Sequence, residues 1–139
     1  MYKKILATYN GSKGSKNALV RALTIAREYS APVTMVWVRD RLPSNPLTIG
    51  EVDEDRNDLK EYFGKFKKDA QNLANQYGIK IQCTCLKGSV ASAIIKYAED
   101  NEIDLIVIGK RGDNWITNKL RRNTIKNIEK TINYDVLDV

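Results

Sequence analysis

Two glycine-containing turns are the parts of this 139-residue chain whose residue types and spacing best suit ligand binding. The first turn begins at Asn10, after the apolar run 5–8, and the second spans Gly109 to Gly112, after the β-branched run 105–108. Glycine lets the backbone approach a ligand closely, and the N–H groups at a helix start attract anions. In a parallel sheet such turns lie at the carboxyl ends of strands, where ligands bind at the point of reversed strand order. We therefore expect the two turns to share one crevice.

The remaining residue types exclude several kinds of catalytic or metal site. The chain has no histidine, which excludes His-dependent triads and most zinc hydrolase designs. Its two cysteines, Cys83 and Cys85, lie on one face of a period-2 segment and are interpreted as small buried apolar residues. Neither turn has the spacing of a P-loop or a dinucleotide fingerprint, and no general base is identifiable near them. We assign no catalytic residue and no metal site.

Alternating strand-like and helix-like segments position the turns. The expected strands cover residues 4–8, 33–38, 79–86, 105–108 and 136–139. The expected helices cover residues 13–29, 51–77 and 89–101, followed by a last helix that carries apolar residues from Ile116 to Ile132. Ser12 is the expected N-cap of the first helix, and Trp37 is interpreted as a core residue. This alternation predicts an α/β fold with a parallel sheet, and one domain over residues 1–139.

Composition and charge indicate where in the cell the protein is located and which kinds of partner it can bind. The chain is 42% hydrophobic and 29% charged, as is typical of globular proteins. No apolar run approaches the roughly 20 residues that span a bilayer, and the N-terminus has no signal-peptide pattern. We expect a cytoplasmic protein without a membrane partner. The net charge is +6, and basic residues concentrate beside the second glycine turn: Lys110, Arg111, Lys119, Arg121, Arg122, Lys126 and Lys130.

Three stretches of the chain resemble the universal stress protein family. Residues 3–19, KKILATYNGSKGSKNAL, resemble the family's opening KKILVPxDGSxxSxxAL. Residues 98–112, AEDNEIDLIVIGKRG, resemble its A-x-x-x-x-x-D-L-I-V-M-G-x-x-G stretch, and residues 134–139 resemble its closing CPVLVV. The resemblance implies an open, twisted five-stranded parallel sheet of order 3-2-1-4-5 with helices on both faces, as in adenine-nucleotide α-hydrolase-like proteins. It also implies a regulatory or protective role in the stress response.

The resemblance further implies a crevice for ATP or AMP with Mg²⁺, in which several motif positions are altered. Asn10 stands where ATP-binding members have aspartate, and Thr8 where they usually have proline. Val38 corresponds to the adenine-contacting valine. The phosphate motif G-2x-G-9x-G-[ST] matches in its first half, but its second half falls on Arg122 and Asn123. The candidate nucleotide-binding residues are Thr8, Asn10, Val38, Ile108, Gly109, Gly112, Arg122, Asn123 and Thr124.

Arg122 has two opposite interpretations. Its side chain could crowd the path that glycine leaves open for phosphates, or its guanidinium could grip a phosphate as a bidentate donor. We expect a degenerate nucleotide crevice that acts as a non-catalytic switch. Slow ATP hydrolysis at the same crevice is the enzymatic alternative.

Nucleic-acid or general anion binding is the alternative from another class. Residues 106–116 also resemble the IGxxGxxI turn of a KH domain, whose loop clamps a nucleic-acid backbone. A KH turn joins two helices, however, whereas this one follows a β-branched run, and the order of elements differs. Looser RNA or anion binding by the basic residues stays open, and steep salt dependence without adenine preference would identify it.

The last strand is the expected dimer contact. Family members commonly dimerise by pairing their terminal strands about a two-fold axis, and the strand here consists of Val136, Leu137, Asp138 and Val139. Asp138 interrupts the usual run of valines, and an unpaired carboxylate in a dry symmetric interface is costly. If Asp138 faces solvent or meets a lysine, dimerisation survives, and we expect a homodimer.

Overall fold

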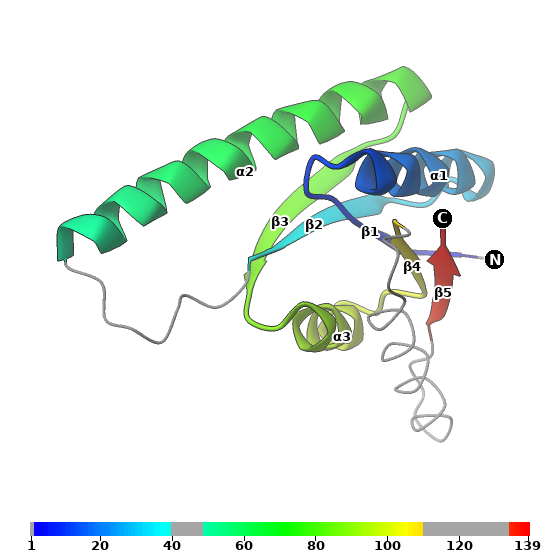
Figure 1. The fold of residues 1–139 in the computed structure, drawn as a ribbon. Helices are drawn as coiled ribbons and strands as arrows, with labels where there is room; N and C mark the ends of the chain where they lie inside the picture. Colours follow the sequence, from blue (N-terminus) through cyan, green and yellow to red (C-terminus); the bar gives the residue numbers. More distant parts are fainter. Residues whose placement is uncertain (1, 40–48, 110–133) are drawn as a thin grey trace.

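The fold is a five-stranded parallel sheet with helices on both faces (Figure 1). A computed structural model describes residues 2–39, 49–109 and 134–139; for residues 39 and 49–59 only the backbone is described. The strands are β1 Ile5–Thr8, β2 Val33–Arg39, β3 Ile81–Lys87, β4 Leu105–Ile108 and β5 Asp135–Asp138. The helices in the described part are α1 Lys13–Tyr29, α2 Ile49–Tyr77 and α3 Val90–Asp100.

The strand order is β3-β2-β1-β4-β5, which confirms the order implied by the family resemblance. The chain builds the sheet outward from β1 through β2 to β3, and then returns past β1 to add β4 and β5. Ile5 is therefore in register with Val33 of β2 on one side and with Leu105 of β4 on the other. The strand order reverses at β1, so the switch point lies between β1 and β4.

Alternating side chains divide the core into two layers. Ile5, Met35 and Val107 are fully buried against α1 and α2, on what we call the α1–α2 face. Leu6 and Ile106 are fully buried against α3, on what we call the α3 face. Figure 1 shows α1 and α2 on one side of the sheet and α3 on the other. The nearly continuous apolar strands of the sequence follow from this cover on both faces.

The local sequence signals place the helix ends correctly. Ser12 is the N-cap of α1, and its side chain accepts a hydrogen bond from the Ser15 N–H at 3.2 Å. Ser89 and Asn101 are the caps of α3, so this helix is one residue shorter at each end than the predicted range 89–101. Helix α2 begins at Ile49, two residues before the predicted start at 51. The predicted last helix lies outside the described residues.

The sheet edge at β3 corrects one expectation. Cys83 is half-buried on the α1–α2 face, and this burial raises the pKa of its thiol. Cys85 is exposed, because β3 is an edge strand and its carboxyl end is not fully covered. The interpretation as buried residues is thus wrong for Cys85. No group of three or more metal-ligating side chains occurs in the described part of the chain. Nor does that part contain a helix long and apolar enough to cross a membrane.

Candidate functional site

The candidate site lies at the carboxyl ends of β1, β2 and β4, where the strand order reverses. Ala7 is in register with Val107, so the next residue of each strand, Thr8 and Ile108, lie at the same level. Thr8 is also in register with Val36, which places Val38 two residues beyond it on β2. Because the strands are parallel, their carboxyl ends lie at the same end of the sheet (Figure 1).

Three predicted site residues share the α3 face. Val38 and Ile108 pack with the buried cluster around Leu6 and Ile94. Thr8 belongs to the same face because it lies two residues after Leu6 on β1. Thr8 and Val38 are half-buried, whereas Ile108 is buried. The predicted site residues of three different strands therefore lie on one face and at one end of the sheet.

Asn10 follows the carboxyl end of β1, in a loop whose conformation is fixed by hydrogen bonds within the loop. The Tyr9 N–H donates to the Val36 carbonyl at 2.9 Å, which extends the β1–β2 ladder and brings Asn10 level with Val38. The side-chain oxygen of Asn10 accepts the Ser12 N–H at 3.0 Å, as in an Asx-turn. Its backbone N–H donates to Ser15 Oγ at 3.2 Å. The side-chain amide of Asn10 also has two N–H donors, which it can offer to a ligand oxygen.

Ser15 is the buried hydroxyl that closes this loop. Its Oγ donates to the Ser12 carbonyl at 2.9 Å and lies 3.0 Å from Ser12 Oγ. It is the buried polar residue of the described core, and its hydrogen-bonding capacity is used within the loop. The second serine of the N-G-S-x-x-S stretch therefore stabilises the conformation that presents Asn10.

Gly109, the first residue of the second glycine turn, lies against the start of α1. A Cβ on Gly109 would collide with the backbone carbonyl of Gly14 and lie 2.8 Å from the Ser15 nitrogen. Gly109 thus contacts the first turn of α1 directly, while residues 110–112 of the second turn lie outside the described residues. The space that this glycine leaves open is filled by protein backbone, so the close approach at Gly109 is between two segments of the chain.

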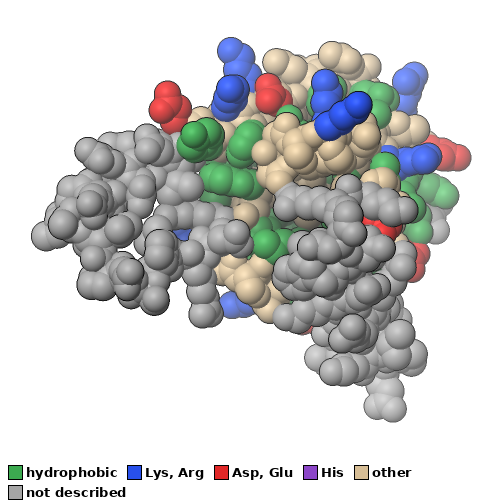
Figure 2. Space-filling view, in the orientation of Figure 1, with side chains coloured by type: hydrophobic (Ala, Val, Ile, Leu, Met, Phe, Trp, Pro, Cys, Tyr) green, Lys and Arg blue, Asp and Glu red, His purple; other side chains and the backbone are tan. Residues whose placement is uncertain are grey.

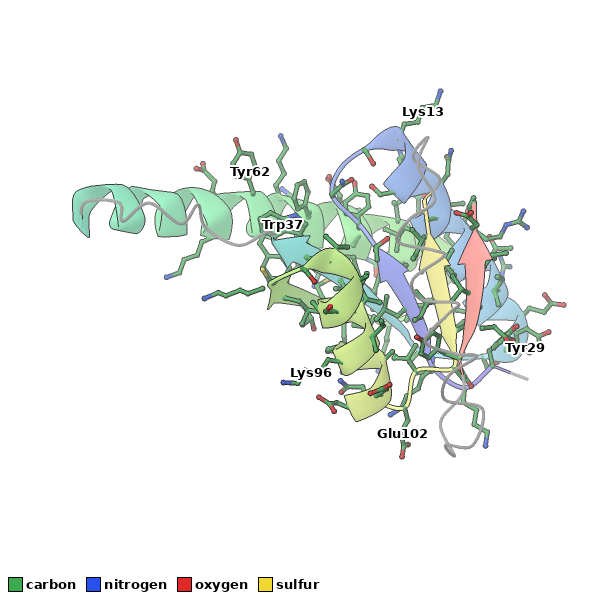
Figure 3. The ribbon with its side chains drawn as sticks, turned by 60° about the horizontal axis from the view of Figure 1, so that its bottom comes forward. Lys13, Tyr29, Trp37, Tyr62, Lys96 and Glu102 are labelled. Atoms are coloured by element: carbon green, nitrogen blue, oxygen red, sulfur yellow. The ribbon has the colours of Figure 1, made fainter. Side chains whose placement is uncertain are left out.

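The start of α1 is electropositive. Its first turn contains no acidic residue, and Lys13 and Lys16 are exposed there. Figure 3 shows Lys13 extending away from the sheet. A helix N-terminus carries partial positive charge, so these lysines add to a local preference for anions. Figure 2 shows further Lys and Arg side chains spread over the side of the molecule formed by α1 and α2.

The other predicted site residues, Gly112, Arg122, Asn123 and Thr124, lie outside the described residues, as do Trp115 and the basic segment from Lys110 to Lys130. The described part of the site offers an amide, a hydroxyl and aliphatic side chains. These groups can hydrogen-bond to a ligand and pack against its apolar part.

Sequence reasoning missed an aromatic cluster behind the site. Tyr9 directly precedes Asn10, and Trp37 directly precedes Val38. Because side chains alternate along a strand, both rings lie on the α1–α2 face. Both rings contact Phe66 of α2, at centroid distances of 5.8 Å and 5.3 Å. The Tyr9 hydroxyl donates to Asp69 Oδ2 at 3.4 Å, and burial together with this carboxylate raises the pKa of Tyr9. Strand alternation was the available signal for Tyr9 and Trp37, but it could not identify the opposing helix.

Comparison with known proteins identifies the class of protein. Residues 1–138 match the model of the universal stress protein family. A universal stress protein of Methanocaldococcus jannaschii is 31% identical over 140 residues, covering all of this chain and 82% of the relative. The chain therefore belongs to the universal stress protein family, a family of stress-response proteins.

Solved structures of this family have the same fold. A universal stress protein from Lactobacillus plantarum has 22% identity and a TM-score of 0.73, with 98% of this chain and 97% of that one covered. A universal stress protein in complex with cAMP has 20% identity and a TM-score of 0.67, with 99% and 97% covered. An Arabidopsis thaliana family member with AMP bound has 14% identity and a TM-score of 0.66, with 98% and 91% covered.

Proposed function

We propose that this chain binds an adenine nucleotide at the carboxyl ends of β1, β2 and β4 and acts as a non-catalytic, nucleotide-responsive switch. The observation that carries the proposal is the convergence of Thr8, Val38 and Ile108 on the α3 face, with Asn10 level with Val38. The family resemblance implies nucleotide contacts at these positions of the sequence. Two structural neighbours hold cAMP or AMP, which supports an adenine nucleotide as the ligand.

The described residues fit such a ligand in their chemistry. Val38 and Ile108 provide aliphatic surface of the kind that packs against a base. The side-chain amide of Asn10 can donate to a ribose oxygen, although it lacks the negative charge of the family's aspartate. The start of α1, with Lys13 and Lys16, favours a phosphate group nearby. Mg²⁺ would accompany ATP as a counter-ion of its phosphates.

Calorimetric titration with ATP, AMP and cAMP, with and without Mg²⁺, tests this proposal. We expect binding in the micromolar range for at least one nucleotide. Asn10→Ala should weaken it about tenfold, which corresponds to the loss of one ligand hydrogen bond. Asn17→Ala is the matched control, because Asn17 is an exposed residue of α1. A wild-type chain that binds none of the three nucleotides would contradict the proposal.

Arg122→Gly separates the two interpretations of Arg122. If Arg122 grips a phosphate, the variant binds ATP more weakly than the wild type. If Arg122 crowds the phosphate path, the variant binds ATP more tightly, and cAMP or AMP is the natural ligand because each has fewer phosphates. Phosphate release from ATP, measured on the same samples, distinguishes a switch from a slow ATPase.

Basic-surface anion binding is the second candidate. It is favoured by the exposed lysines of α1 and α2, among them Lys13, Lys16, Lys65 and Lys68. Binding of RNA by such a surface weakens steeply with salt and shows no adenine preference. A titration of single-stranded RNA between low and physiological salt therefore distinguishes it from the crevice.

We further propose a homodimer formed by pairing of the β5 edges. Strand β5 is the outermost strand of the sheet on that side. One of its backbone edges pairs with β4, and no strand of the described residues pairs with the other edge. Asp138 lies two residues after Val136, which packs on the α3 face. By alternation the Asp138 carboxylate therefore belongs to that face of the sheet, to one side of the backbone edge that would pair. This placement lowers the expected cost of Asp138 in an edge-to-edge dimer.

A further inference from the structure

We propose that Phe66 of α2 is a positioning residue for the nucleotide site, although it lies on the opposite face of the sheet. Its ring holds the loop after β1 and the end of β2 together, so that Asn10 and Val38 present their side chains side by side. This inference rests on the proposed nucleotide binding and assigns a part of that function to α2.

The first contact is between Phe66 and Gly11, the residue that follows Asn10. A Cβ built on Gly11 would lie 2.8 Å from Cε1 of Phe66 and 3.6 Å from its Cδ1 and Cζ. Gly11 has a φ of +84°, in the left-handed region that side-chain-bearing residues rarely adopt. The ring edge thus lies directly against a loop backbone that only glycine forms at low cost. A shift of this loop toward α2 would require the ring to move as well.

The second and third contacts connect the two strands that carry the ligand contacts. Tyr9 meets Phe66 edge-on with an interplanar angle of 89°, and Trp37 meets it at 74°. Both are geometries that aromatic pairs prefer. Tyr9 directly precedes Asn10, and Trp37 directly precedes Val38, so one ring supports both site residues from behind. A change of packing at Phe66 therefore acts on the relative position of Asn10 and Val38.

Phe63, one turn earlier on α2, provides a natural comparison. It is half-buried like Phe66 and stacks on Trp37 at 6.3 Å with an interplanar angle of 12°. Among the ring contacts of the described residues, Phe63 meets Trp37, whereas Phe66 meets Tyr9, Trp37 and Tyr62. Tyr62 is 58% exposed and lies at the outer side of the cluster, as Figure 3 shows. Phe63 and Phe66 thus share helix, residue type and burial, but the ring nearest to Gly11 is that of Phe66, whereas Phe63 stacks on Trp37.

The experiment compares Phe66→Leu with Phe63→Leu in the full chain. Three quantities are measured: the Tm without ligand, the Kd for AMP and cAMP by calorimetry, and the hydrogen exchange of the Gly11 and Ser12 amides without ligand. Both variants should lower the Tm to a similar extent, since both lose aromatic packing. Phe66→Leu should raise the Kd about fivefold to tenfold because the loop must then be ordered on binding. It should also speed exchange of the two loop amides.

Phe63→Leu should change the Kd less than about twofold and leave loop exchange as in the wild type. If Phe66→Leu loses too much stability to be titrated, Phe66→Met and Phe63→Met replace the pair, because the unbranched, flexible methionine side chain adapts better to the space that the ring leaves. Equal changes in Kd for the two positions, or unchanged loop exchange in the Phe66 variant, overturn the inference while the wild-type titration still supports nucleotide binding. A wild-type chain that binds neither nucleotide overturns the proposed function and this inference with it.

Discussion

Single residues at the two glycine turns have different physical reasons for being glycine. Gly11 needs its positive φ, whereas Gly109 needs the absence of a Cβ because the backbone of Gly14 occupies that direction. Gly64, in the exposed part of α2, has nothing within 4 Å of a built Cβ. Glycine is thus required for its backbone conformation at position 11 and for its lack of a Cβ at position 109, whereas position 64 could accept another residue. Only the first two bear on the site.

We expect Gly109→Ala to destabilise the chain by about 2–3 kcal/mol, because the added methyl group must push apart two backbone segments. Gly64→Ala is the control and should stabilise it by about 0.5–1 kcal/mol, since alanine favours a helix interior. Urea unfolding followed by circular dichroism measures both. A Gly109→Ala chain as stable as the wild type would show that the contact with α1 is loose.

At the level of elements, Asp104 connects the start of β4 to the start of β1. Its two carboxylate oxygens accept the Lys3 N–H at 2.7 Å and the Lys4 N–H at 3.0 Å. The Asp104 N–H in turn donates to the Lys4 carbonyl at 3.1 Å. The two central strands on either side of the switch point are therefore fixed relative to each other at their amino ends. The family motif residue before L-I-V is in this structure a strand-joining residue.

We expect Asp104→Ala to cost about 1–3 kcal/mol, because two backbone N–H groups lose a charged acceptor. Asp104→Asn keeps a single acceptor oxygen and should lose an intermediate amount. Asp100→Ala, at the exposed end of α3, is the control and should change stability by less than about 0.5 kcal/mol. Equal stabilities of the Ala and Asn variants would argue that only one of the two hydrogen bonds contributes.

At the scale of the whole molecule, Tyr2 joins the two ends of the chain. Its hydroxyl donates to Asp135 Oδ2 at 2.7 Å, and its ring meets Tyr29 edge-on at 5.6 Å. Tyr2 precedes β1 and Asp135 begins β5, so the bond links the amino ends of these two strands. The hydrogen bond to Asp135, followed by burial, raises the pKa of Tyr2 to about 12. The protonated phenol is therefore favoured in the folded state.

This raised pKa predicts a pH dependence of stability. Because the folded-state pKa lies above the ordinary value of 10.0, the contribution of Tyr2 is fully present below pH 10. It is lost as the pH rises from 10 toward about 12. The difference in unfolding free energy between the wild type and Tyr2→Phe should thus be constant from pH 8 to about 10 and then shrink. Tyr9 also has a raised pKa, but it is common to both chains and cancels in the difference.

The proposed dimer can be tested through the hydrogen-bonding direction of β5. The Asp135 N–H donates to the Asp104 carbonyl and the Val139 N–H to the Ile108 carbonyl, both at 2.9 Å. The backbone N–H groups of the odd-numbered residues therefore point toward β4. The N–H groups of Val136 and Asp138 therefore face the outer edge. Proline at position 138 removes an outward donor and should leave the β4–β5 pairing intact.

We accordingly expect the wild type to sediment as a dimer and Asp138→Pro as a monomer with an unchanged circular dichroism spectrum. Asp138→Ala keeps the N–H and should dimerise at least as well as the wild type. A dimer that persists in Asp138→Pro would mean that the chains associate through another surface.

The sequence predicted the elements well because their signals are local. Alternating apolar residues, the caps Ser12 and Ser89, and the break after Asn101 are set by neighbours within a few residues. For the elements in the described part of the chain, the predicted helix and strand bounds therefore agree with the structure within about two residues. The family motifs added the strand order, which local patterns alone do not contain. The exposure of Cys85 was not predictable in this way, since it depends on how far α2 covers the sheet edge.

For the candidate site, the sequence alone determined which residue types stand at the strand ends: Asn10 in place of aspartate, Thr8 in place of proline, and glycine at position 109. The tertiary structure decided what surrounds them. It placed the backbone of Gly14 against Gly109 and the ring of Phe66 against Gly11. Phe66 lies 55 residues from Gly11 in the chain, and contacts over such separations arise only when the sheet and its helices assemble. The periodicity of the sequence determines on which face of a helix or strand a residue lies. The residue that it contacts on that face is determined by how the elements pack in the tertiary structure.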